Sequence, residues 1–126
     1  MKLDDRLIKD SELIAKLELS ELRLIRDGDL DWFMLIPLRE NIIEWCELSS
    51  SDQMILCQEI DRVSKLLKKE GADKVNIGAL GNMVPQLHVH LIGRKREDRA
   101  WPNAIWGTNA LTDFNVERVE YWKSKF

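Results

Sequence analysis

The sequence predicts an α+β fold, in which an antiparallel sheet of roughly five strands carries one long helix on one face. Short apolar or alternating segments separated by turn-forming residues occupy residues 18–37 and 73–94, and a stretch with helical periodicity lies between them. The chain has 126 residues, of which 44% are hydrophobic and 33% charged, which is typical of one globular domain. We therefore expect a single domain over residues 1–126, with its core at about 19–94 and a C-terminal tail at 95–126.

The N-terminal part of the chain predicts one hairpin. Residues 7–17 mix apolar and charged side chains without clear turn signals, and we expect a short helix and a loop there. Residues 18–25 alternate in part between apolar and polar side chains, as a half-buried strand does, and the turn-forming residues 26–29 follow. Residues 32–37 form a continuous apolar run that ends at a proline, which is typical of a buried strand. The two strands should pair across the turn.

A long helix is predicted over residues 51–70. Its apolar positions recur at helical spacing, and Ser50 with Gln53 forms a capping-box pattern at its start. Two lysines in the last turn suit the negative end of the helix dipole, and Gly71 is the residue type that most often ends a helix. A helix of this length can cover one face of the sheet.

Two further strands are predicted after the helix. Residues 73–80 are interpreted as a strand that contains a glycine, Gly81 and Asn82 as a tight turn, and residues 84–94 as the next strand. Strands joined by so short a turn are antiparallel.

Both histidines of the chain lie in this last strand, two positions apart. Because side chains alternate between the two faces of a strand, Gln86, His88 and His90 share one face. Two imidazoles with Cα atoms about 6.5–7 Å apart suit either a nucleophile with a proton donor or part of a metal site. A metal site needs a third and usually a fourth ligand, for which the sequence offers only carboxylates such as Glu97 and Asp98 or two distant cysteines.

Composition and charge argue against several classes of function. The net charge of −3 disfavours binding to nucleic-acid polymers. No apolar run approaches the roughly 18 residues that a membrane helix needs, and the N-terminus lacks the pattern of a signal peptide. Only two cysteines are present, both in apolar or helical contexts. We expect a cytoplasmic protein that does not bind membranes.

The segment Pro85–Ile92 resembles the signature of the histidine triad superfamily, in which three histidines alternate with apolar residues; Gln86 stands at the first histidine position. The order of hairpin, long helix, strand and histidine strand over residues 19–94 is similar to that of the family. The tail around Trp101 and Trp106 is similar to a bacterial branch in which the glutamine is usual. The resemblance implies a HIT-like fold and a homodimer with a continuous sheet.

The resemblance also implies a chemistry. Histidine triad proteins bind a purine nucleotide or nucleotide conjugate and hydrolyse or transfer its nucleoside monophosphate, and neither a metal nor another cofactor is implied. By position, His88 matches the catalytic nucleophile, whose Nδ1 hydrogen is held by the backbone carbonyl of the first motif residue, here Gln86. His90 matches the catalytic histidine that donates to a phosphate or leaving-group oxygen.

Four residues are expected to bind the substrate: Asp27, Asn76, Asn82 and Gln86. By resemblance, Asn76 lies near the phosphates and the leaving group, and Asp27 accepts hydrogen bonds from the ribose hydroxyls. Each also has a structural interpretation, since Asn76 and Asn82 suit turn or strand-end hydrogen bonds and Asp27 suits a turn.

Two residues depart from the family pattern. Gln86 replaces the first histidine, and Trp32 stands where several relatives carry a histidine that is hydrogen-bonded toward it. The two changes indicate that a supporting imidazole relay has been replaced by a different arrangement. They also make a second function plausible, a nucleotide-binding module with weak or no catalysis. Turnover of a phosphoramidate or a dinucleoside polyphosphate, as opposed to binding alone, would discriminate the two.

Overall fold

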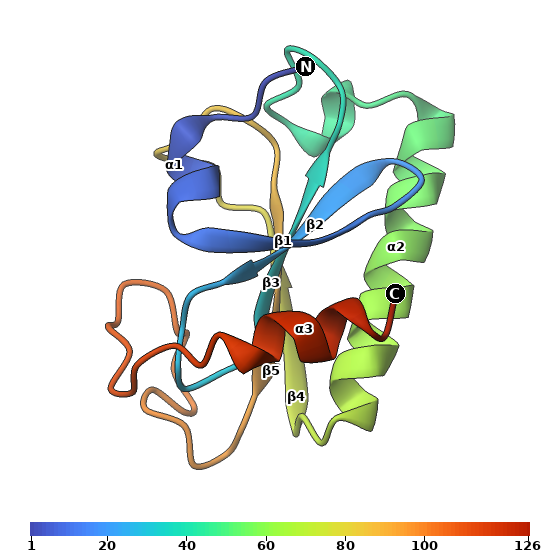
Figure 1. Cartoon of the computed structure of the whole chain (residues 1–126). Helices are drawn as coiled ribbons and strands as arrows, with labels where there is room; N and C mark the ends of the chain where they lie inside the picture. The colour runs from blue at the N-terminus through green and yellow to red at the C-terminus, as the bar shows by residue number, and fades with distance from the viewer.

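The computed structural model describes all 126 residues and contains a five-stranded antiparallel sheet with helices on both of its faces (Figure 1). The α+β fold class is confirmed. The elements in chain order are α1 (Asp5–Lys9), β1 (Ser11–Lys16), β2 (Ser20–Ile25), β3 (Trp32–Pro37), a 3-10 turn η1 (Trp45–Glu47), α2 (Ser50–Lys69), β4 (Lys74–Gly78), β5 (Val89–Arg94) and α3 (Glu117–Lys123).

The sheet has the strand order β1-β2-β3-β5-β4, and every neighbouring pair is antiparallel. β5, which carries His90, therefore lies between β3 and β4 and has both backbone edges paired. The two outer strands are β1 and β4. A side chain on an inner strand is held more firmly than one on a loop, because both neighbouring strands fix its backbone.

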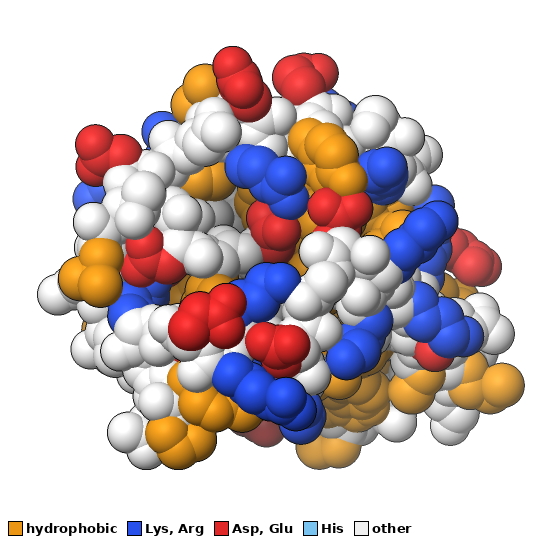
Figure 2. All heavy atoms as spheres, turned by 90° about the horizontal axis from the view of Figure 1, so that it is seen from below, with side chains coloured by type: hydrophobic (Ala, Val, Ile, Leu, Met, Phe, Trp, Pro, Cys, Tyr) orange, Lys and Arg blue, Asp and Glu red, His pale blue; other side chains and the backbone are white.

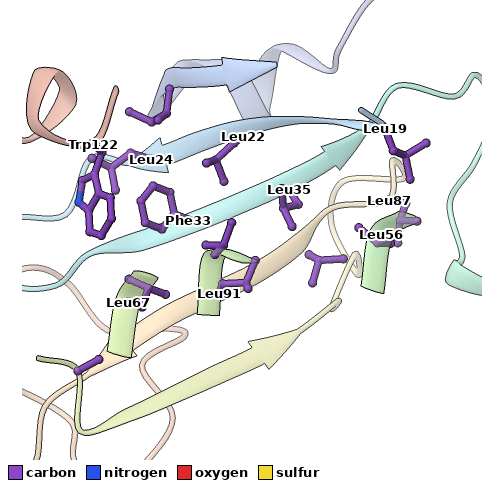
Figure 3. Close-up of a cluster of buried hydrophobic side chains, with 14 of the residues drawn as sticks. Leu19, Leu22, Leu24, Phe33, Leu35, Leu56, Leu67, Leu87, Leu91 and Trp122 are labelled. Carbon is purple, nitrogen blue, oxygen red and sulfur yellow. The ribbon is translucent and has the colours of Figure 1, made fainter. Parts of the chain in front are cut away.

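The larger hydrophobic core lies between the sheet and α2. Figure 3 shows Leu56 and Leu67 of α2 pointing at Phe33, Leu35 and Leu91 of the sheet. These residues are 1% exposed or less, so they have left water almost completely. The other members of this core are Ile14, Leu19, Leu22, Leu24, Leu48, Val63, Ala72, Leu87, Val89 and Trp122.

The opposite face of the sheet is covered by two smaller clusters. Leu3 and Leu7, from the N-terminal segment and α1, pack on Met34 and Ile36 of β3. A separate cluster, formed by Leu30, Trp32, Ile92 and Ile105, lies toward the other end of β3 and β5. Since His90 pairs with Met34 in the sheet, it lies between these two clusters.

The predicted hairpin is confirmed as β2 and β3, but the prediction for residues 7–17 is wrong in part, because residues 11–16 form strand β1. The pairing of β1 with β2 slips between Leu13 and Ala15, as in a β-bulge. The buried positions of β1, Ser11 and Ile14, are consequently three residues apart. A strand with this spacing does not show the alternation by which strands are recognised in a sequence.

The long helix is confirmed with one correction at its start. Its N-cap is Ser49, whose hydroxyl accepts from the backbone N–H of Asp52 at 3.1 Å. Gln53 donates its side-chain amide to the carbonyl of Leu48, so the predicted capping box with Ser50 does not form. At the other end Gly71 has a φ of 101°, and the N–H groups of residues 71 and 72 close the helix on the carbonyls of residues 68 and 67.

Two other expectations need correction. The predicted tight turn at Gly81 and Asn82 is wrong, because β4 ends at Gly78 and β5 begins at Val89, with residues 79–88 as a longer link. The buried core also extends beyond residues 19–94, since Trp122 of α3 is fully buried against it.

Charged side chains of both signs are interspersed on the face shown in Figure 2, so this face carries no continuous basic patch. None of the helices combines the length and apolar character that crossing a lipid bilayer requires.

Candidate active site

The two histidines lie side by side on the face of the sheet opposite α2. His88 directly precedes β5, and His90 lies within it, opposite Met34 of β3 and Gly78 of β4. The two rings have their centroids 5.0 Å apart, and both residues are more than nine-tenths buried. The prediction that the two imidazoles share one face is confirmed.

The hydrogen bond of His88 fixes which of its nitrogens is free. Nδ1 lies 2.7 Å from the backbone oxygen of Gln86. A carbonyl oxygen can only accept, so Nδ1 carries the hydrogen and the lone pair of a neutral His88 is on Nε2. Nε2 has no hydrogen-bond partner within the chain. His88 therefore presents an available lone pair.

His90 has the opposite arrangement, which the sequence did not reveal. The indole N–H of Trp32 donates to Nδ1 of His90 at 2.9 Å. Because an indole N–H can only donate, Nδ1 is the acceptor and the hydrogen of a neutral His90 is on Nε2. The pair thus offers one lone pair and one N–H donor from adjacent rings, as nucleophilic attack on a polarised centre requires.

Trp106 is the second aromatic ring that packs against His90, beside Trp32. Its ring centroid is 5.6 Å from that of His90 and 6.3 Å from that of Trp32. Gly78 makes this approach possible, because a Cβ there would lie 3.0 Å from the Trp106 ring. The indole nitrogen of Trp106 is buried without a partner in the chain and is therefore an available donor. The sequence gave no signal for this contact.

Burial keeps His90 uncharged. Burial, the larger cause, and the nearby His88 together lower the pKa of His90 to about 4. Since the ordinary value is 6.5, His90 is neutral throughout the physiological pH range.

The side chain of Gln86 contacts the N-terminal segment, and its role toward a substrate stays a prediction. Its side-chain oxygen accepts from the backbone N–H of Asp4 at 2.8 Å, and Arg6 donates to the carbonyl of Met83 at 3.1 Å. These bonds hold the N-terminal segment against the link before β5. A recess of about 840 Å³ lies there, lined by residues 1–6, residues 39–42, Pro85 and Gln86.

The other predicted substrate-binding residues are not gathered around the imidazoles by any side-chain contact. Asp27 accepts from the backbone N–H of Asp29 at 2.8 Å and pairs with Arg99 at 2.8 Å, so its interpretation as a turn former is confirmed. Asn76 accepts from Arg94 at 2.8 Å. Asn82 is exposed in the link between β4 and β5. Their roles toward a substrate stay predictions.

A buried ion pair at the end of β5 positions the segment that carries Trp106. Arg94 donates to Asp98 at 2.7 Å, and each side chain is 2% exposed. Arg94 also donates to the carbonyl of Asn103, and Asp98 accepts from the N–H groups of residues 95, 100 and 101. These bonds hold the pKa of the Asp98 carboxyl well below its usual range. No three side chains of His, Cys, Asp or Glu come together as a metal site would require.

Comparison with known proteins identifies the family of the chain. The model of the HIT domain family matches residues 6–97. A crystal structure of a histidine triad protein from Bradyrhizobium japonicum is 40% identical, with a TM-score of 0.92 over 98% of this chain and 92% of that one. One from Sinorhizobium meliloti is 40% identical, with a TM-score of 0.91 over 98% and 93% of the two chains. One from Marinobacter aquaeolei is 35% identical, with a TM-score of 0.90 over 98% of this chain and 91% of that one.

No curated protein matches the chain. The chain belongs to the HIT domain family.

Proposed function

We propose that the protein hydrolyses or transfers the nucleoside monophosphate of a purine nucleotide conjugate, with His88 as the catalytic nucleophile. Proteins of the HIT family generally bind nucleotides and act as hydrolases or transferases. The observation that carries the proposal is the hydrogen bond from Nδ1 of His88 to the Gln86 carbonyl, because it leaves the Nε2 lone pair free. A neutral imidazole in this tautomer is a competent nucleophile at phosphorus.

The proposed reaction has two steps. In the first, Nε2 of His88 attacks the α-phosphorus, a P–N bond forms, and the bond to the leaving group breaks with its electron pair on the leaving group. The Gln86 carbonyl stabilises the resulting positive imidazolium through Nδ1–H. The rings of His90 and Trp106 lie next to each other, and their N–H groups can donate to phosphoryl oxygens. In the second step, the oxygen of water or of another acceptor attacks phosphorus, the P–N bond breaks with its electron pair on Nε2, and the proton of the attacking group is released to solvent.

The substitution of the first motif histidine by Gln86 does not remove any part of this machinery. The acceptor for His88 is a backbone atom, which every residue at position 86 supplies. The side chain of Gln86 binds Asp4 instead. The alternative, a binding module without catalysis, would need a different reason for the alignment of His88.

Mass spectrometry of protein quenched during turnover of an adenosine dinucleoside polyphosphate tests the proposal. We expect an adenylyl adduct on the peptide that contains His88, because the first step makes a covalent P–N bond. Gln86→Ala is the matched variant, since it keeps the carbonyl and should form the same adduct. Nucleotide binding without any adduct would favour the binding module.

We also propose that two copies join through β4. This strand is an outer strand of the sheet, and Ile77 on it is 52% exposed, so the edge offers both unpaired backbone groups and apolar surface. Sedimentation at micromolar concentration should give a dimer, and Ile77→Lys should shift it toward a monomer. The matched control is Leu13→Lys on β1, the other outer strand, which should stay dimeric. A monomeric wild-type protein would overturn this proposal.

A further inference from the structure

We infer that Trp32 is a positioning residue that restricts His90 to hydrogen-bond donation, and that the substrate is therefore an acid anhydride of a nucleoside monophosphate. Such a substrate joins the nucleotide to a phosphate or carboxylate, which leaves as a stable anion. The inference rests on the proposed function and names its substrate class.

The first step of the argument is the contact between Trp32 and His90. The indole N–H points at Nδ1 of His90 at 2.9 Å. If Nδ1 of His90 were protonated, its N–H would point at the indole N–H of Trp32. Two donors would then face each other with no acceptor between them. The imidazolium form of His90 is therefore opposed by a fixed neighbour, in addition to burial.

The remaining surroundings of His90 do not favour its charged form either. Met34 from β3, Gly78 from β4 and the ring of Trp106 carry no charge. The titratable group that acts on His90 is His88, which disfavours a second positive charge beside it.

The second step concerns what a neutral His90 can do. Its Nε2–H can donate to an oxygen and stabilise negative charge there. It does not give up that proton at neutral pH, because a neutral imidazole is a very weak acid, and the single hydrogen bond from Trp32 to Nδ1 is too little to stabilise an imidazolate. The P–O bond to the leaving group must then break with its electron pair on an oxygen that needs no proton. Phosphate and carboxylate meet this condition at neutral pH, whereas an alkylamine does not.

No other group near the reacting histidines supplies the missing proton. His88 is the nucleophile, and its Nδ1–H is held by a carbonyl. The N–H of Trp106 does not ionise, so it acts only as a donor. An amine leaving group would therefore depart without protonation, which is very slow.

The test compares two substrates that share the same adenylyl group, an adenosine dinucleoside polyphosphate and an adenosine phosphoramidate of an alkylamine. Because a positioned general acid is worth roughly 10²–10⁴-fold, we expect wild-type kcat/KM to favour the anhydride by at least about 10²-fold. Trp32→Gln provides an amide oxygen that can accept from Nδ1–H, so His90 can become a general acid. In this variant the ratio of kcat/KM for the anhydride to kcat/KM for the phosphoramidate should fall about tenfold or more. Its phosphoramidate turnover should also increase as the pH is lowered.

Trp32→Phe is the matched control, since it removes the indole N–H without offering an acceptor. It should not improve phosphoramidate turnover. Nitrogen NMR of the wild-type protein gives a readout without substrate, and it should show His90 with a bare Nδ1 and a protonated Nε2 at neutral pH. Comparable wild-type turnover of both substrates, or a protonated Nδ1, would overturn the inference while leaving the nucleophile in place. Absence of an adduct on His88 with either substrate would instead overturn the proposed function.

Discussion

His88→Ala is expected to lower turnover of an adenosine dinucleoside polyphosphate by roughly 10⁴-fold or more, because it removes the atom that forms the covalent bond. The ring is buried beside His90 and makes one hydrogen bond, to the backbone of Gln86. Its loss therefore removes little that a bound nucleotide needs in the ground state. Nucleotide affinity, measured by calorimetry, should change by less than about tenfold, since the lost group acts on the barrier.

His90→Asn provides the comparison. It keeps a donor beside His88 and leaves the nucleophile intact, so it should retain adduct formation at a lower rate. Undiminished turnover by His88→Ala would show that another group attacks phosphorus.

Trp122→Ala is expected to lower the free energy of unfolding by about 3–5 kcal/mol, as for other large-to-small changes in a packed core. Trp122 is fully buried, and its ring centroid lies 4.9 Å from that of Phe33 in an edge-to-face arrangement. Its indole N–H also donates to Asp31 at 3.1 Å, so the change leaves a cavity and removes one hydrogen bond from Asp31, which keeps its ion pair with Arg118. Urea unfolding monitored by circular dichroism measures the loss.

The control for this prediction is Lys123→Ala, the next residue of α3, whose side chain is exposed. Exposed substitutions of this kind usually change stability by no more than about 0.5 kcal/mol. Equal effects of the two variants would mean that α3 does not contribute to the core.

The elements that the sequence revealed are those whose burial follows a simple period. β3 is an uninterrupted apolar run, and α2 has apolar residues at helical spacing over 20 residues. β1 was missed because a bulge changes its spacing, and α3 was missed because Trp122 reaches the core from a segment that is otherwise polar or half-buried.

The candidate site was predictable where it depends on backbone geometry. The alternation of a strand places His88 and His90 together, and the carbonyl of Gln86 follows from chain connectivity. The partners of these residues could not be predicted, because they depend on strand pairing and loop packing. Trp32 reaches His90 from a strand 58 positions away in the sequence, and the side chain of Gln86 binds Asp4, 82 positions away.

The placement of Trp32 and Trp106 around His90 also gives the protein a built-in optical signal. Indole emission responds to the polarity of its surroundings and to nearby groups that quench it, and these two indoles lie within 6.3 Å of each other and of the His90 ring. Trp122 is held in the core on the other face of the sheet, so it supplies a steady background. Occupancy of the site can therefore be followed by intrinsic fluorescence without attaching a dye.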